Sequence, residues 1–442
     1  MSRAVPSKML PMSETMGADA FRDITVERIK LQPIGVNAAT AYTPTTLNKI
    51  HYRIPAYSSS FMDCARTYLS FTVQSAGTNL TATHNATFGN GLPIFNRMVI
   101  KSSNGLTIED ISQYHLLTRL FTIMSTEEDY RVQEGIYSDD DPDQTVGAQL
   151  LTGLKYTIQF NCGLLDKKLK SFLPLFMMSS SYALDVELYL SSPAECMRLV
   201  GSGGTTPTNV SYSLSNPIMN ICLLKMDNQL CSRYNAIACD PSESIVIPFT
   251  TYRCHVHTLN SQTSVVHINE ASTNVKRIYS VFTPVSQSVG HALVLPFKGS
   301  SKQGSDAERI TSYTYRLGNQ FVFNEPVVET TDNKDTLFFV KDAVWSTDKP
   351  MMLSKNESSL VTNFESAVKQ MYFTTANMTY SQEETRGVVQ GTSSAIPIEL
   401  NVSFAATPTL LVNNFVEIGL DLVIKNGQIR FQEKLPGSNK VY

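Results

Sequence analysis

Apolar and polar residues alternate along many short stretches of the chain. The alternation is clearest in IHYRIPA, TYLSFTVQS, LKYTIQFNC and YALDVELYLS. A period of two places successive side chains on opposite faces of the backbone, which is typical of a β-strand with one buried face. Threonine, serine, valine, tyrosine and phenylalanine, which favour strands, are abundant. The chain is therefore predicted to be all-β.

Pairs of asparagine and glycine separate several of these stretches. Asn104-Gly105, Gly318-Asn319 and Asn426-Gly427 each lie between two alternating runs. Two-residue hairpin turns need positive φ angles, which these residue types adopt readily. We expect three tight hairpins, with a type I′ turn at Asn104-Gly105.

A few segments depart from the alternation. Apolar residues recur at helical spacing over residues 111–124, with Asp110 or Ser112 available as the N-cap. A second helix is expected over residues 358–371. The acidic, turn-rich residues 126–149 are predicted to form a long exposed loop. FLPLFMMSS is nearly all apolar and predicts a strand buried on both faces.

The chain divides into two similar halves around residues 217–259. An apolar run there is followed by a polar segment at Asp240-Pro241 and a new strand. A length of 442 residues predicts two or three domains. We expect an N-terminal arm at residues 1–45, a first domain at 46–235 and a second at 236–442. Within the arm, residues 18–30 could form a short amphipathic helix, and the arm either frays or docks on a partner or membrane.

Composition restricts the classes of function. The net charge is -3 and the pI about 6.2, which does not suit a protein that binds nucleic acid by neutralising phosphates. No run approaches the roughly 20 apolar residues of a membrane span, and the N-terminus lacks a secretion signal. We therefore expect a soluble protein made inside the cell. The seven cysteines have no CxxC spacing, so they are expected to be free thiols.

Two charged clusters could bind ligands, but a simpler interpretation suits both. The first is acidic and lacks the spacing of a calcium loop, so it is interpreted as a solvated loop. The second is basic and is interpreted as a solvated turn, with contact to nucleic acid or an acidic neighbour as the alternative. The clusters comprise Asp139, Asp140 and Asp141, and Lys167, Lys168 and Lys170.

One strand carries residues that could hold a metal ion. His255 and His257 share a face of Cys254-His255-Val256-His257, and His267 could be a third ligand. Only two of the three or four ligands that a metal needs are placed, so a half-exposed strand is preferred. The sequence also lacks GxSxG, GxGxxG, Walker and HExxH motifs. We predict no catalytic, cofactor or metal site, and no enzyme.

Four segments, in order, resemble the double jelly-roll major capsid proteins of double-stranded DNA viruses. They are FNRMVIKSSNGLTIEDISQYHLLTRLF and FLPLFMMSSSYALDVELYL in the first half, and NVKRIYSVF and YTYRLGNQFVFNEP in the second. The modest loops look more like those of polinton-like viruses and virophages than those of giant algal viruses. YTIQFNCG is plainer than the aromatic-rich strand usual in the large-virus branch.

The resemblance implies two tandem eight-stranded jelly-roll β-sandwiches with short helical insertions. It implies a homotrimer with pseudo-hexagonal outline that contacts neighbouring capsomers, penton and minor capsid proteins and tiles an icosahedral shell enclosing double-stranded DNA. It further implies assembly inside the host cell, location in the virion and no small-molecule substrate. Contact with an internal membrane or the genome stays open. The long insertions at residues 126–149 and 329–355 are expected at trimer contacts or on the outer face.

Jelly rolls also occur in proteins of other functions. A lectin-like carbohydrate-binding protein, or another minor virion or attachment protein, is the alternative. Carbohydrate clefts rely on tryptophan and paired carboxylates, but the chain has one tryptophan, Trp345, and no convincing carboxylate pair. The sequence therefore favours a structural shell protein.

Overall fold

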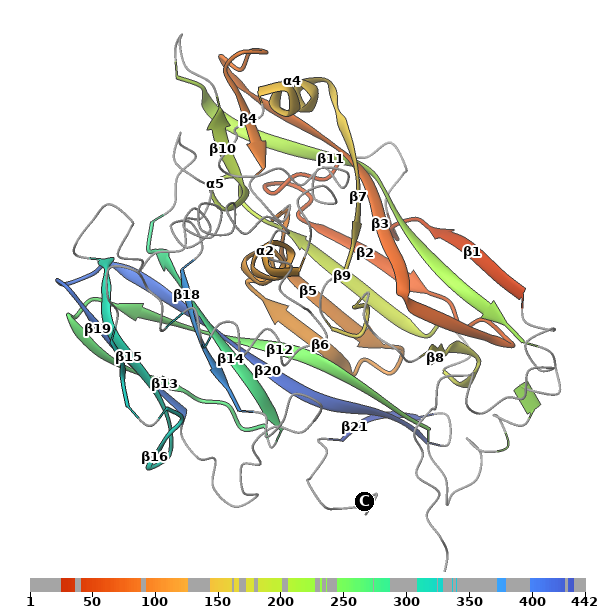
Figure 1. Ribbon diagram of the computed structural model, residues 1–442. Helices are drawn as coiled ribbons and strands as arrows, with labels where there is room; N and C mark the ends of the chain where they lie inside the picture. Colours follow the sequence, from red (N-terminus) through yellow and green to blue (C-terminus); the bar gives the residue numbers. More distant parts are fainter. Residues whose placement is uncertain are drawn as a thin grey trace, which may run out of the picture.

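A computed structural model shows a β-rich chain built from two similar units that lie side by side (Figure 1). It describes residues 25–35, 41–88, 93–125, 144–160, 163–166, 172–178, 182–200, 206–226, 231–232, 236, 245–272, 274–286, 308–323, 325–328, 336, 339, 372–378, 398–425 and 428–432. The strands of each unit pair only among themselves in this part of the chain.

The first unit contains two large antiparallel sheets and a small one. One sheet has the order β1 (Thr25–Leu31), β11 (Thr208–Lys225), β3 (Ser60–Thr78) and β7 (Leu154–Gln159), and β8 (Phe172–Pro174) also pairs with β3. The other has the order β2 (Lys49–Ile54), β9 (Leu184–Leu190), β5 (Phe95–Ser102) and β6 (Thr107–Ser112). A small separate sheet pairs β4 (Asn85–Phe88) with β10 (Met197–Val200).

The second unit repeats this arrangement. Its first sheet has the order β12 (Ile245–Leu259), β20 (Leu410–Lys425), β14 (Val275–Pro284) and β18 (Phe373–Asn377), with β21 (Gln428–Gln432) on β20. Its second has the order β13 (Thr263–Ile268), β19 (Ile398–Phe404), β15 (Ile310–Leu317) and β16 (Gln320–Phe321), with β17 (Val327–Val328) on β15.

Both units follow one topology. Without the accessory strands β4, β8, β10, β17 and β21, the described residues of each unit form eight strands, whose order along the chain gives one sheet of order 1-8-3-6 and another of order 2-7-4-5. This order is that of a jelly roll, in which the first and last strands are neighbours in one sheet. The expected all-β fold of two eight-stranded jelly rolls is confirmed, and the units are called the first and second roll below.

Short helices occur in the first roll. They are α2 (Tyr114–Ser125), α4 (Gln144–Thr152), α5 (Pro193–Cys196) and the 3-10 helix η2 (Leu175–Met177). Helix α2 lies between the two rolls (Figure 1). Buried apolar side chains of both rolls form one continuous cluster. The core therefore extends across the joint between the rolls.

Several local expectations are wrong. The first helix begins at Tyr114, because residues 111 and 112 end strand β6, so neither Asp110 nor Ser112 caps it. FLPLFMMSS forms only the three-residue strand β8 and then η2, and residues 144–149, expected in a loop, lie in α4. The expected helix at residues 358–371 lies outside the described residues.

The N-terminal segment also differs from expectation. Thr25–Leu31 is neither helix nor arm, because it pairs along its length with β11 as the first strand of the first roll. Pairing with a neighbouring strand satisfies the backbone polar groups that a short isolated helix would leave to water.

The hairpins form where asparagine and glycine predicted them. β5 pairs with β6, β15 with β16, and β20 with β21. At the first hairpin Gly105 has φ 83°, but Asn104 does not have a positive φ. The turn is therefore not type I′. Asn104 instead accepts a hydrogen bond from Ser102 through its side-chain oxygen, which also accepts one from the Leu106 N–H (3.2 Å).

Candidate functional site

One of the two histidines of β12, His255, binds a carboxylate. Glu270 is buried, and its two oxygens accept hydrogen bonds from Arg253 Nη1 (2.7 Å) and His255 Nε2 (3.2 Å). Burial by itself would raise the pKa of Glu270, but the bonds and charges of His255, Arg253 and Ser272 hold it at about 2. Glu270 is therefore ionised at neutral pH and fixes the loop after β13 to β12.

The structure does not gather the other two candidate ligands into a metal site among the described residues. His267 lies on β13 and pairs with Glu399 at 3.4 Å, in an exposed position. His257 has a lowered pKa because of burial and the nearby charges of His255 and His267. Across the described residues, no group of three or more His, Cys, Asp or Glu side chains has a geometry that could hold a metal ion. Asp139, Asp140, Asp141, Lys167, Lys168 and Lys170 lie outside those residues.

Most of the cysteines that the structure describes are buried free thiols. Cys64, Cys196 and Cys222 are buried and Cys254 is partly buried, and none of these four forms a disulfide. Burial raises the pKa of Cys64 and raises that of Cys254 to about 12. A thiol that stays protonated is a poor nucleophile.

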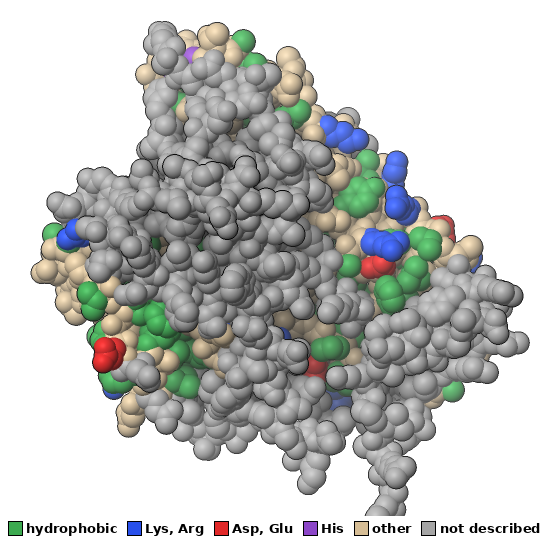
Figure 2. Space-filling view, viewed as in Figure 1, with side chains coloured by type: hydrophobic (Ala, Val, Ile, Leu, Met, Phe, Trp, Pro, Cys, Tyr) green, Lys and Arg blue, Asp and Glu red, His purple; other side chains and the backbone are tan. Residues whose placement is uncertain are grey.

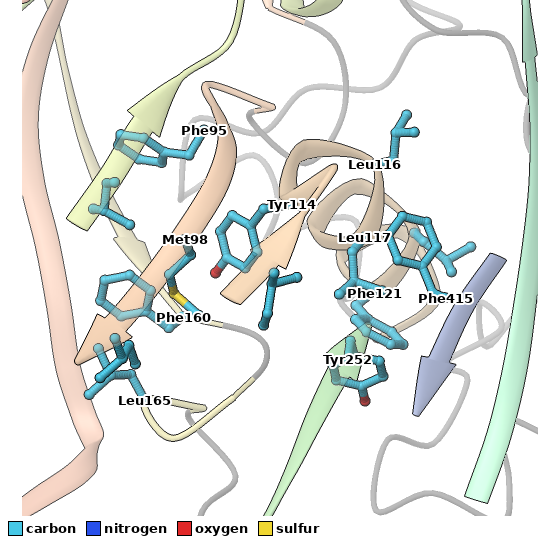
Figure 3. Packing of buried hydrophobic residues seen from close by; sticks show 14 of the residues in the cluster. Phe95, Met98, Tyr114, Leu116, Leu117, Phe121, Phe160, Leu165, Tyr252 and Phe415 are labelled. Carbon is cyan, nitrogen blue, oxygen red and sulfur yellow. The ribbon is translucent and has the colours of Figure 1, made fainter. Parts of the chain in front are cut away.

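The two rolls meet at a joint formed by buried side chains. Helix α2 follows β6 of the first roll and points Leu117 and Phe121 toward the second roll (Figure 3). The Phe121 ring lies 5.2 Å from that of Tyr252 and 5.6 Å from that of Tyr279. Phe415 completes this apolar face on β20 (Figure 3). Buried aromatic contacts of this kind hold two packed units in a fixed relation.

Polar groups at the same joint are paired. Arg277 Nη1 donates to Glu417 Oε1 (2.8 Å), and the Tyr279 hydroxyl donates to Glu417 Oε2 (3.2 Å). Arg277 and Glu417 are both about 95% buried and lie opposite one another on β14 and β20. Because the register places Tyr252 beside Glu417, the ion pair lies on the face that α2 covers.

Glu109 of β6 is a buried carboxyl in this joint. Its Oε2 accepts a hydrogen bond from the Leu164 N–H (2.6 Å), and Gly163 has φ 82° and no room for a side chain because the carboxyl fills that space. Burial raises the pKa of Glu109, as does the charge of Asp166 to a lesser extent. The Leu164 N–H and the Thr251 hydroxyl of the second roll lower it, and the resulting pKa is about 7.

Each roll carries charged pairs on the outer face of the sheet that contains its second strand. In the first roll Glu187 of β9 lies between Lys49 of β2 (3.4 Å) and Lys101 of β5 (3.1 Å). In the second roll Glu399 of β19 lies between His267 of β13 and Arg316 of β15 (3.8 Å). When the eight strands of each roll are counted in chain order, both rolls therefore place an acidic side chain on the seventh strand between basic side chains on the second and fourth strands.

Sequence reasoning did not identify the groups at the joint. Glu109 and Asp110 are adjacent on a strand, and successive side chains of a strand point to opposite faces. The sequence therefore indicated that one of these two carboxyls faces the interior. The pairing of Arg277 with Glu417 joins residues far apart in the sequence, and no pattern along the chain indicates it.

Comparison with known proteins concerns the fold. No protein-family model matches the chain, and no curated protein sequence matches it. Among solved structures, a chain of the PBCV-1 virus capsid has a TM-score of 0.60 and 11% identity, with 93% of this chain and 97% of that chain covered.

The Faustovirus major capsid protein has a TM-score of 0.55 and 9% identity, with 91% of each chain covered. A Sputnik virophage chain solved by cryo-EM has a TM-score of 0.55 and 10% identity, with 92% of this chain and 88% of that chain covered. The chain has the double jelly-roll fold. This confirms, at the level of the fold, the resemblance carried by four sequence segments. Because identities this low show the fold alone, the expected likeness to polinton-like viruses and virophages stays a prediction.

None of the helices in the described part of the double jelly roll is long and apolar enough to span a membrane.

Proposed function

We propose that the protein is a structural major capsid protein. The main support is that the two rolls share one topology and that this chain aligns over nearly the whole length of solved viral capsid chains. We propose that the boundary between the two domains lies between residues 235 and 236; this is supported by the last strand of the first roll ending at Lys225 and the first strand of the second beginning at Ile245.

In this function three chains form a capsomer. Two rolls per chain give six rolls in a threefold ring, and this arrangement approximates sixfold symmetry. Such capsomers pack hexagonally, contact penton and minor capsid proteins, and tile an icosahedral shell around double-stranded DNA. The protein then resides in the virion after assembly inside the host cell, and contact with an internal membrane or the genome is part of the same proposal.

The internal chemistry supports a structural role. The charged side chains of Glu270, Arg277 and Glu417 form hydrogen-bonded ion pairs inside the protein. Burial keeps the Cys64 thiol protonated. Each of these groups stabilises packing and offers no exposed nucleophile or base to a substrate. We propose that the protein has no catalytic activity, no cofactor and no metal, and that it acts through its surfaces.

Light scattering on the purified chain tests the proposal. A mass of three times the chain's 49.0 kDa, with pseudo-hexagonal particles in negative-stain images, is the expected result. A stable monomer that binds sugars on a glycan array would instead support the lectin-like alternative. Stoichiometric zinc in the purified protein would contradict the absence of a metal site.

A further inference from the structure

Helix α2, which lies between the two rolls, has a polar side that the proposed function does not use. His115 and Arg119 are about one turn apart in α2, so their side chains share a face of the helix, and Leu117 lies on the opposite face. Leu117 and Phe121 point toward the second roll (Figure 3). One short helix therefore carries two side chains that can be positively charged and the apolar contacts that hold the joint.

Both of these polar side chains are removed from water. His115 is 1% exposed and Arg119 is fully buried. Figure 2 shows Lys and Arg side chains at the surface of the molecule, beside hydrophobic and acidic ones, where water can solvate their charge. A buried positive charge lacks this solvation, so a second positive charge beside Arg119 is strongly unfavourable.

The ring of His115 is suited to the neutral form. Among the described residues, no group forms a hydrogen bond with its Nδ1 atom. A neutral imidazole carries one N–H and can leave Nδ1 without a hydrogen, whereas a protonated imidazole carries an N–H on each nitrogen. Protonation of His115 in the docked helix therefore buries an N–H donor without an acceptor, in addition to the charge.

Two charged groups in the described part of the chain act on His115. Burial lowers the pKa of His115 to about 4; the charge of Glu195 on α5 raises the pKa and that of Arg119 lowers it. The Glu195 carboxylate also accepts the hydrogen bond from the Ser192 N–H (2.7 Å) that caps α5. The basic residues of β5, the strand that packs against α2, pair instead with acids of their own sheet; the pairs are Arg97 with Asp110 and Lys101 with Glu187.

The sign of the acid effect follows from proton binding. Once α2 reaches water, His115 has its ordinary pKa of about 6.5, whereas the docked helix keeps the ring neutral down to about pH 4. Between these values the released state binds more protons than the docked state. The docked state is therefore fully favoured above about pH 6.5 and becomes less favoured as the pH falls toward 4.

We propose that His115 is an acid-operated latch, whose protonation releases α2 from the second roll. Release separates the two positive charges from the interior, because both side chains then reach water. A helix satisfies its backbone hydrogen bonds internally, so α2 can move away without breaking a ladder of paired strands. The contact that is lost is the one that Phe121 makes with Tyr252 and Tyr279. Acid thus loosens the joint and leaves the sheets of both rolls paired.

Hydrogen exchange measured by mass spectrometry tests the latch in wild type and His115→Gln, from about pH 4.5 to 7.5. Glutamine does not titrate, so the variant lacks the latch. Glu109 titrates in the opposite sense, but it is present in both proteins, and the ratio of their opening constants isolates His115. After correction for intrinsic exchange rates, this ratio of wild type to variant in α2 should rise about tenfold for each pH unit below about 6.5, to about a hundredfold at pH 4.5.

Leu116→Ala is the matched control for a weakened helix. Leu116 is the residue after His115, is also 1% exposed and does not titrate, so its loss weakens the packing of α2 equally at every pH. The ratio of opening constants between this variant and wild type should stay constant over the pH range. Peptides from β3 and β11 are an internal reference, because the proposed release leaves their sheet paired.

Glu195→Gln tests the charges around His115 without altering α2. Glutamine can still accept the hydrogen bond from the Ser192 N–H that caps α5, and it removes the charge that raises the pKa of His115. The histidine NMR signal that titrates near pH 4 should therefore titrate at a lower pH in this variant. This measurement also covers the case in which His115→Gln does not fold.

The latch is wrong if the exchange of α2 in wild type and His115→Gln depends on pH in the same way. It is also wrong if peptides of β3 and β11 show the same acid-dependent ratio as α2, because acid would then unfold the whole roll. An unchanged titration of His115 in Glu195→Gln would contradict the arrangement of charges. The latch lies within one chain, so none of these results bears on the shell function, which the mass of the assembled protein at neutral pH decides.

Discussion

Replacing Glu109 with glutamine should make the stability of the protein less dependent on pH. The carboxyl is fully buried in the joint between the rolls and has a pKa of about 7. Glutamine has nearly the same shape, and its side-chain oxygen can still accept the hydrogen bond from the Leu164 N–H. The substitution therefore removes the ionisation while keeping the packing.

The size and sign of the effect follow from proton binding. The unfolded chain loses the Glu109 proton near pH 4.5, whereas the folded chain keeps it up to about pH 7. Between these values the folded state binds more protons, so the free energy of unfolding falls by about 1.4 kcal/mol for each pH unit. The loss reaches about 3 kcal/mol at pH 7 and above, and Glu109→Gln should not show it.

Urea unfolding of wild type and variant from pH 4.5 to 8 measures this difference. Burial lowers the pKa of His115 to about 4 and makes stability fall as pH decreases, but this contribution is common to both proteins and cancels. Asp110→Asn is the control, because Asp110 is the next residue and is partly exposed beside Arg97. The reasoning is refuted if the pH profiles of wild type and Glu109→Gln run parallel over this range.

Three further results are expected. Phe121→Ala should lower the free energy of unfolding by about 3–5 kcal/mol in urea titrations, because it opens a cavity at the joint; a loss below about 1 kcal/mol would show that α2 does not hold the rolls together. Arg277→Met should cost a similar amount because it leaves Glu417 buried without a partner. The double variant Arg277→Met with Glu417→Leu should recover most of that loss of stability. A loss equal to the sum of the losses of the two single variants would contradict this pairing. Intact mass under non-reducing, denaturing conditions should match the fully reduced chain, and a loss of two hydrogens would reveal a disulfide.

In the second roll, local sequence patterns predicted individual strands and turns but not the order of the strands in the sheets. Alternation in residues 398–404 and the Gly318-Asn319 turn predicted β19 and the β15–β16 hairpin, because period and turn chemistry depend only on neighbouring residues. The same local signals occur in both halves, so the duplicated fold was visible in the sequence. Its strand order was available only through resemblance, since β12 pairs with β20 across more than a hundred residues.

Local pattern was wrong where tertiary contacts decide between alternatives. Thr25–Leu31 has apolar residues that also suit a helix, and only the available edge of β11 makes it a strand. The hydrophobic segment at residues 172–177 became a short strand and a 3-10 turn, because η2 packs Leu175 and Met177 into the core there.

The sequence by itself determined the all-β class, the two similar halves and most of the hairpins, because these depend on residue type and short spacing. Only the tertiary structure decided which residues meet at the joint. Glu109 meets Thr251, Phe121 meets Tyr252, and Arg277 meets Glu417. Such contacts depend on how the two rolls are placed against one another, and that placement minimises exposed apolar area over the whole chain rather than along any segment.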